Sequence, residues 1–354
     1  MTRREPIWSA ARLNEEISRA VGASLAFTPR GEVIHFREFA RQSSVVSADG
    51  KWRLEDDPAA VADVIGLKVA GIETVMSNLN GKPPLLALCA LDPQAWCVVI
   101  IHPIALKSVG PFRDVSSPFR EWLLRAADAG HSIGMSRVTS IGQFFRATPP
   151  DRLLVAGDPL PLVTSEGSGL FVFPLPQLVP LGDSELPTWL VEHLQRFDAG
   201  RLGCQVKSRD DAIALSAGVW QMNGCLDRSH ELAQTIEGKG RHRAGDYWHA
   251  IMHRREPDYC NAKYWFRRVG QHGIHLFLAR DADDILASCR SCEAVRWRSA
   301  LIKKGRQEWD ALAFVDLCEQ VEEGHDAELS QAARQIQLIE MALLLSSTYH
   351  DAVA

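Results

Sequence analysis

The apolar residues of this chain follow different periods in its two halves. Beyond residue 187 they recur every three to four positions, the spacing that gives an α-helix one buried face. Residues 309–321 are typical, and Gly324 and Asp326 are suited to end that helix and to cap the next one. This pattern predicts helices at 190–197, 210–222, 226–236, 246–256, 258–269, 283–287, 309–321 and 327–347.

In the first half, helical and strand-like patterns alternate. Helical spacing is found at 8–22, 58–77 and 118–129, and strand-like runs lie at 24–27, 32–36, 85–90, 96–101, 152–155 and 170–173. The mixture predicts an α+β or α/β N-terminal domain followed by an all-α C-terminal domain. Four prolines between residues 174 and 187 are typical of a connector, so we place the domains at 1–185 and 186–354.

Length and composition agree with two domains. A chain of 354 residues, 46% hydrophobic and 23% charged, has enough apolar material for sizeable cores. Its formal net charge of −5 argues against a protein that coats nucleic acid with its whole surface. The longest apolar run, 85–101, is interrupted by Asp92, Pro93 and Gln94, so we expect no membrane span. Because no apolar signal-peptide core follows the N-terminal arginines, we expect a cytoplasmic protein.

The eight cysteines are scattered along the chain, unlike the dense spacing of a secreted disulfide scaffold. Only Cys289 and Cys292 form a C-x-x-C pair, and no second pair is present to complete a zinc ribbon. Ordinary reduced cysteines are the simplest interpretation. A redox or metal-binding role for this pair is the alternative.

Histidines on one predicted helix are the candidate metal ligands. His249 and His253 are four residues apart and therefore share a face, and Glu256 extends the same stripe. Two imidazoles and a carboxylate at this spacing are suited to a divalent metal, and His230 is a candidate further donor. The motif lacks the glutamate of H-E-x-x-H, and Pro257 favours non-helical geometry at Glu256. The alternative is that these histidines are structural or contact a ligand directly.

Charge is distributed unevenly along the helical half. Residues 241–306 hold 14 Lys and Arg against 7 Asp and Glu, whereas residues 307–354 hold 1 against 10. Acidic C-terminal helices packed beside the basic segment would neutralise it. Alternatively, the basic residues line a site for phosphate or carboxylate groups. The residues predicted to bind such an anion are Arg254, Arg255, Asn261, Lys263, Tyr264 and Arg267.

The helical half also contains an internal repeat. Residues 220–236 align with 253–269 at an offset of 33 residues, and each unit is predicted as a helix, a tight turn and a helix. Tyr259, Ala262 and Phe266 give the second unit a resemblance to a tetratricopeptide-type hairpin, which implies stacked helix pairs that form a groove. The stretch WHAIMHRREPDYCNAKYWFRRVG also resembles a signature of an uncharacterised bacterial protein family, and that resemblance implies no activity.

These observations favour a binding or interaction protein whose helical groove holds a small anionic ligand or an acidic protein segment. The alternative is an enzyme, assisted by a divalent metal, with its site at the interface of the two domains around His249 and His253. RNA binding through the basic and aromatic stretch is a third, weaker hypothesis. The sequence contains no P-loop, dinucleotide-binding or kinase motif, so it does not decide whether the protein is an enzyme.

Overall fold

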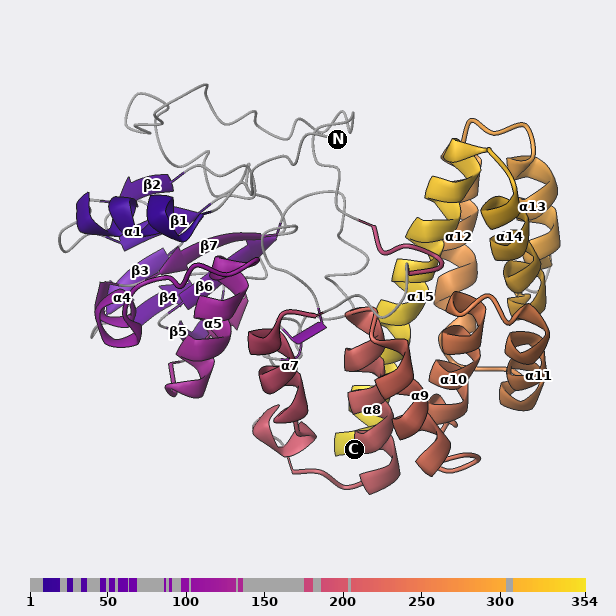
Figure 1. Cartoon of the computed structure of the whole chain (residues 1–354), viewed down its shortest axis with the longest axis horizontal. Helices are drawn as coiled ribbons and strands as arrows, with labels where there is room; N and C mark the ends of the chain where they lie inside the picture. The colour runs from indigo at the N-terminus through magenta and orange to yellow at the C-terminus, as the bar shows by residue number, and fades with distance from the viewer. Residues whose placement is uncertain are drawn as a thin grey trace. The chain divides into compact units, whose positions relative to one another are not determined.

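The chain divides into two compact units, Met1–Phe173 and Pro174–Ala354 (Figure 1). The predicted domains, 1–185 and 186–354, place the boundary slightly later, within the same proline-rich connector, and stay a prediction. The computed structural model describes residues 9–19, 24–27, 33–36, 45–48, 51–54, 57–62, 64–68, 86, 89–90, 97–101, 103–131, 133–135, 175–180, 186–202, 205–303 and 308–354.

The predicted fold class is wrong. Helices dominate the described residues and every strand is short, so the molecule is mostly helical and gives no support to a separate α/β or α+β N-terminal domain. Local predictions failed in both directions: Leu86, Cys89 and Ala90 are helical where a strand was predicted, and the described residues within 58–77 are extended. The physical reason is that a short apolar run has the same composition in a buried strand as in a buried helix.

Short strands of the first unit form two small sheets. One has the order β2-β1-β7-β6-β8, with only β6 and β8 parallel, and the other has the order β3-β4-β5. The predicted strands at 24–27, 32–36 and 96–101 correspond to β1, β2 and β7, whereas those at 152–155 and 170–173 lie outside the described residues. The strands are β1 Ser24–Phe27, β2 Val33–Phe36, β3 Val45–Ala48, β4 Lys51–Leu54, β5 Asp57–Ala62, β6 Val64–Lys68, β7 Cys97–Ile101 and β8 Ile133–Met135.

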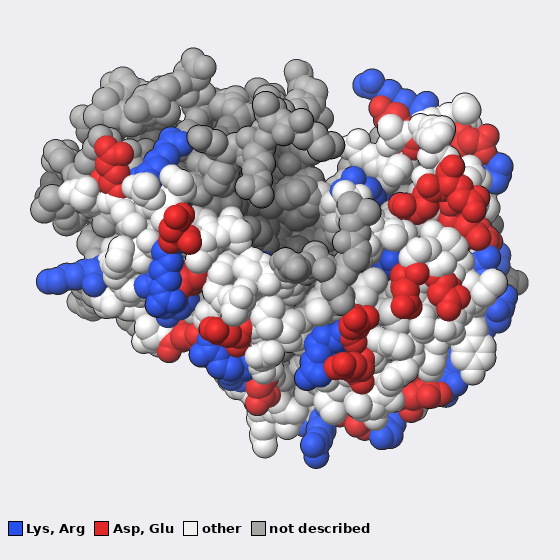
Figure 2. Space-filling view, in the orientation of Figure 1, with Lys and Arg blue, Asp and Glu red and all other residues white. Residues whose placement is uncertain are grey.

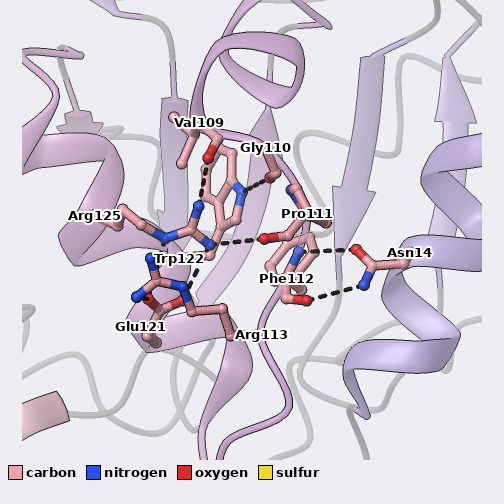
Figure 3. A network of polar contacts seen from close by, with 9 residues as sticks. All are labelled: Asn14, Val109, Gly110, Pro111, Phe112, Arg113, Glu121, Trp122 and Arg125. Carbon is pink, nitrogen blue, oxygen red and sulfur yellow. Dashed lines mark hydrogen bonds and ion pairs between the residues drawn. The ribbon is translucent and has the colours of Figure 1, made fainter.

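Three helices of the first unit, α1 (Ala10–Arg19), α4 (Pro103–Val109) and α5 (Pro118–Asp128), surround the loop at 109–113. The Asn14 side chain donates to the Phe112 carbonyl at 2.9 Å and accepts from its N–H at 2.8 Å. From α5, Trp122 donates to the Gly110 carbonyl, and Arg125 donates to the carbonyls of Val109 and Pro111 (Figure 3). The loop's polar backbone groups are thereby satisfied inside the unit, as a folded core requires.

The second unit consists almost entirely of helices among its described residues. Each segment predicted as helical beyond residue 187 contains a helix, and α13 was missed. As predicted, Asp326 caps the last helix by accepting from the Leu329 N–H at 3.0 Å, and Gly324 ends the preceding one. The elements are α7 Thr188–Gln195, a 3-10 turn Ala199–Leu202, α8 Arg209–Met222, α9 Leu226–Thr235, α10 Ala244–Arg255, α11 Tyr259–Val269, α12 His275–Ser288, α13 Ala294–Leu301, β9 Ile302–Lys303, β10 Glu308–Trp309, α14 Ala311–Glu323 and α15 Ala327–Val353.

Helix α10 lies at the centre of this unit, and all of its residues are buried. It packs against α8, α9 and α11, while the long helix α15 packs along α8, α12 and α14 (Figure 1). Gly218 on α8 allows the close approach to α10, because a Cβ there would lie 2.5 Å from the ring of Trp248. No helix of the described residues is long and apolar enough to cross a membrane.

Candidate functional site

Three histidines from two helices converge on one point. His249 and His253 lie on the same face of α10, and His230 reaches them from α9. One ligand atom from each imidazole lies within 4.8 Å of the corresponding atoms of the other two. The ring centroid of His230 is 4.6 Å from that of His249 and 5.3 Å from that of His253. We refer to these residues as the three-histidine cluster.

Helix α11 covers the cluster with a matching stripe of side chains. Asn261, Trp265 and Arg268 are spaced by four and three residues, so they share one face of the helix. The amide nitrogen of Asn261 lies 3.0 Å from Nε2 of His253. The Trp265 ring stacks on His249 at a centroid distance of 4.0 Å, and the Arg268 guanidinium lies 4.7 Å over Trp265.

Burial favours the uncharged form of His249 and His253. It is the largest cause that lowers the pKa of His249 to about 3, and the neighbouring His253, His230 and Arg268 are the further causes. Burial is also the largest cause of the lowered pKa of His253, which the neighbouring Glu256 carboxylate partly offsets. Neutral imidazoles have the free lone pair that a metal ion requires.

Side-chain amides contact two imidazoles of the cluster. Gln234 places its amide nitrogen 2.9 Å from Nε2 of His230, and Asn261 occupies the same position on His253. His253 Nδ1 lies 3.1 Å from the Glu256 carboxylate, which favours a proton on that nitrogen and leaves Nε2 as the acceptor. Nδ1 of His249 is buried and has no hydrogen-bond partner among the described residues. A buried imidazole nitrogen of this kind is open to a ligand, and Nε2 of His272, outside the cluster, is another such nitrogen among the described residues.

The predicted metal ligands are only partly brought together. His249 and His253 are joined by His230, the further donor suggested from the sequence. Glu256 is half exposed and contacts His253 Nδ1, so it orients an imidazole and does not itself belong to the group of converging atoms. Asp258 caps α11 by accepting from the Asn261 N–H at 3.1 Å and is not part of the converging group.

The residues predicted to bind an anion lie in different environments. Arg254 and Arg255 are buried; Arg254 pairs with Glu340 at 2.5 Å, and Arg255 donates to the Gln221 carbonyl at 2.6 Å. Lys263 is paired with Asp316 on α14. Asn261 joins the three-histidine cluster. Tyr264 and Arg267 are exposed, and the structure gives Arg267 no carboxylate partner among the described residues.

These pairings bear on the uneven charge of the sequence. The contacts of Arg254 with Glu340 and of Lys263 with Asp316 and Glu319 join the basic segment to the acidic C-terminal helices. Figure 2 shows acidic and basic side chains interspersed on the visible face of the second unit. Neutralisation between neighbouring helices therefore accounts for part of the charge pattern.

A second group of histidines in the same unit is arranged differently. His275 Nδ1 lies 3.4 Å from the backbone N–H of His272, and its Nε2 lies 3.3 Å from the Tyr247 hydroxyl. Tyr247 donates to Glu340 at 3.0 Å, and the ring of His272 stacks on that of Tyr247. His242 pairs with Asp351 at 2.8 Å. His275 and His242 thus link parts of the unit through hydrogen bonds, whereas Nε2 of His272 has no partner among the described residues.

Sequence reasoning missed Gln234 and did not connect Trp265 or Arg268 with the histidines. The available signal was the four-then-three spacing of Asn261, Trp265 and Arg268, which matches the stripe of His249 and His253 on the preceding helix. Comparison with protein-family models, with curated proteins and with solved structures found no match. The resemblances to the bacterial signature and to a tetratricopeptide hairpin stay predictions.

Proposed function

We propose that the second unit binds a divalent transition-metal ion through His230, His249 and His253. The observation that carries the proposal is the convergence of one imidazole nitrogen from each of three histidines to within 4.8 Å of one another. His249 Nδ1, which is buried without a hydrogen-bond partner among the described residues, supports it. A metal ion would satisfy all three nitrogens at once. It would also join α9 to α10, so binding would stabilise the packing of successive hairpins.

The donor type indicates the class of metal. Three nitrogen donors favour Zn²⁺, Cu²⁺, Ni²⁺ or Co²⁺ over Mg²⁺ and Ca²⁺, which prefer carboxylate, carbonyl and water oxygens. Glu256 supports the same assignment, because a carboxylate on the far nitrogen of a metal-binding histidine fixes its tautomer and raises its basicity. The proposal thus keeps the predicted histidines and gives the predicted carboxylate an orienting role.

This proposal replaces an anionic ligand by a cation as the primary ligand of the unit. Arg254 and Arg255, which headed the predicted anion site, have internal partners in the core. On α10, the side chains of Tyr247, Trp248 and Arg254 hydrogen-bond to α15, so that helix occupies this side of α10. An acidic partner segment is therefore not proposed for that face.

Calorimetric titration of the metal-free full chain tests the proposal. We expect Zn²⁺ to bind and Mg²⁺ to give no signal. His230→Ala should weaken Zn²⁺ binding by at least about a hundredfold, because loss of a direct ligand exceeds the effect of losing an orienting residue. His230 is the least buried of the three, so its removal leaves the core intact.

His325→Ala is the matched control, since it removes an exposed histidine from another part of the unit. The proposal requires this variant to bind Zn²⁺ like the wild type. Equal Zn²⁺ affinity of the wild type and His230→Ala, or no binding by the wild type, would contradict it.

A further inference from the structure

We propose that the metal ion of the three-histidine cluster keeps an exchangeable coordination position, and that this position takes an oxygen-donor anion, a carboxylate or a phosphate, which Arg268 contacts from the side. The inference rests on the proposed function and names the ligand class of that same site.

The donor count is the first argument. The described residues supply a group of three ligand atoms, and a tetrahedral divalent ion takes four. Structural zinc sites are closed by four protein ligands, whereas sites that act on a ligand keep one position for water or an exogenous group. Three histidines with an open fourth position belong to the second kind.

Charge is the second argument. Three neutral imidazoles leave the two positive charges of the ion uncompensated, because Glu256 lies on the far nitrogen of His253 and extends into solvent. An anion in the open position would supply the missing negative charge. Coulomb attraction in such a partly buried site is much stronger than in bulk water.

Arg268 is the third argument. It lies over Trp265, which in turn stacks on His249, so its positive charge is held close to the cluster. Its contacts to Tyr264, at 3.1 Å, and to Glu237, at 2.7 Å, both use Nη1. Nε and Nη2 have no hydrogen-bond partner among the described residues and can form the paired contact that guanidinium makes with carboxylate or phosphate.

The neighbouring amides add further donors. In the metal-free protein, Gln234 and Asn261 direct N–H groups at the lone pairs of His230 and His253. A bound ion would take those lone pairs, and the two amides would then lose their acceptors while remaining beside the ion. Oxygens of a bound anion would give these N–H groups new acceptors, which matters most for the half-buried Asn261, because Gln234 is exposed.

The experiment uses the full chain loaded with Co²⁺, whose visible absorption reports the number and type of its ligands. Inorganic phosphate is the probe, with acetate as the carboxylate equivalent. We expect phosphate to change the Co²⁺ spectrum in a saturable manner. Arg268→Gln should weaken phosphate binding by about tenfold and leave Co²⁺ affinity unchanged, because it removes one charge-assisted contact and no metal ligand.

Arg296→Gln on α13 is a closely matched control. Arg296 also lies over a tryptophan, at 4.9 Å from Trp297, and also pairs with a glutamate, Glu293, yet α13 contributes nothing to the cluster. The phosphate affinity of the Co²⁺-loaded Arg296→Gln variant should equal that of the wild type. Co²⁺ binding without any spectral response to phosphate overturns the inference alone, as does an equal loss in both arginine variants. Failure of the wild type to bind Co²⁺ overturns the proposed function as well.

Discussion

The two groups of histidines in the second unit resemble each other in composition and differ in geometry. His249 in one group and His272 and His275 in the other are all buried, and all have pKa values lowered to about 3 or 4. In the second group both nitrogens of His275 contact protein groups, whereas in the first group nitrogens of three different histidines lie within 4.8 Å of one another. Burial and a lowered pKa are therefore common to both groups, and the convergence of nitrogens from separate residues distinguishes the first.

The largest change in stability is expected from a substitution at Glu340, which joins the second histidine group to the core. Glu340 accepts from both Tyr247 and Arg254 and is fully buried. Glu340→Ala leaves the Arg254 charge buried without a partner, so we expect the free energy of unfolding to fall by about 3–5 kcal/mol. Urea unfolding of the metal-free protein measures it.

The exposed pair of Lys263 and Asp316 gives the control, because Asp316→Ala should change stability by less than about 1 kcal/mol. Zn²⁺ affinity at the three-histidine cluster should be retained by whatever fraction of Glu340→Ala is folded. Equal stability losses in the two variants would show that the buried network does not support the second group.

Lowering the pH should decrease the free energy of unfolding of the second unit, and histidines of both groups should contribute to this decrease. Burial, and for His249 and His272 also interaction with neighbouring groups, lowers the folded-state pKa, so below the unfolded value of about 6.5 the unfolded chain binds protons that the folded chain does not. Stability therefore falls as the pH decreases from about 6.5 to about 4. Each such histidine contributes up to about 1.4 kcal/mol per pH unit.

Unfolding followed across this pH range, with and without Zn²⁺, separates the groups. His275→Gln should flatten the profile equally in both conditions. His249→Gln should flatten it in metal-free protein and should also remove the stabilisation by Zn²⁺. A profile that is flat between pH 6.5 and 4 would contradict the burial of neutral histidines.

The smallest expected effect is a change in Zn²⁺ affinity caused by loss of the residue that orients the His253 imidazole. Glu256 fixes the His253 tautomer from a half-exposed position, so Glu256→Gln should lower Zn²⁺ affinity by about tenfold and leave stability nearly unchanged. Glu319→Gln, another exposed acidic side chain of the unit, is the control for loss of charge. Calorimetric titration measures both, and identical affinities would show that Glu256 is not an orienting residue.

Local spacing predicted the parts of the site that depend on one helix. The four-residue separation of His249 and His253 determines that they share a face, and the capping residues Asp258 and Asp326 determine where α11 and α15 begin. The approach of His230 could not be predicted, because it depends on which faces of α9 and α10 meet.

The burial of Arg254 could not be predicted from the sequence either. Arginines in the last turn of a helix are typical of an exposed end, but α10 is the central helix of the unit and is buried on every side. Glu340, its partner, lies 86 residues further along the chain. Pairs at such separations are fixed by tertiary packing, which also explains why short apolar runs in the first half were assigned to the wrong element types.

The stripe of Asn261, Trp265 and Arg268 makes the rotational phase of α11 a determinant of ligand binding. An α-helix turns by about 100° per residue, so one residue inserted in the first turn of α11, ahead of Asn261, would rotate the whole stripe relative to the start of that helix and away from His249 and His253. The histidine pair would remain intact on α10. A single insertion there would thus separate the three-histidine cluster from its covering residues in one step, whereas substitutions within the helices would remove those residues one at a time.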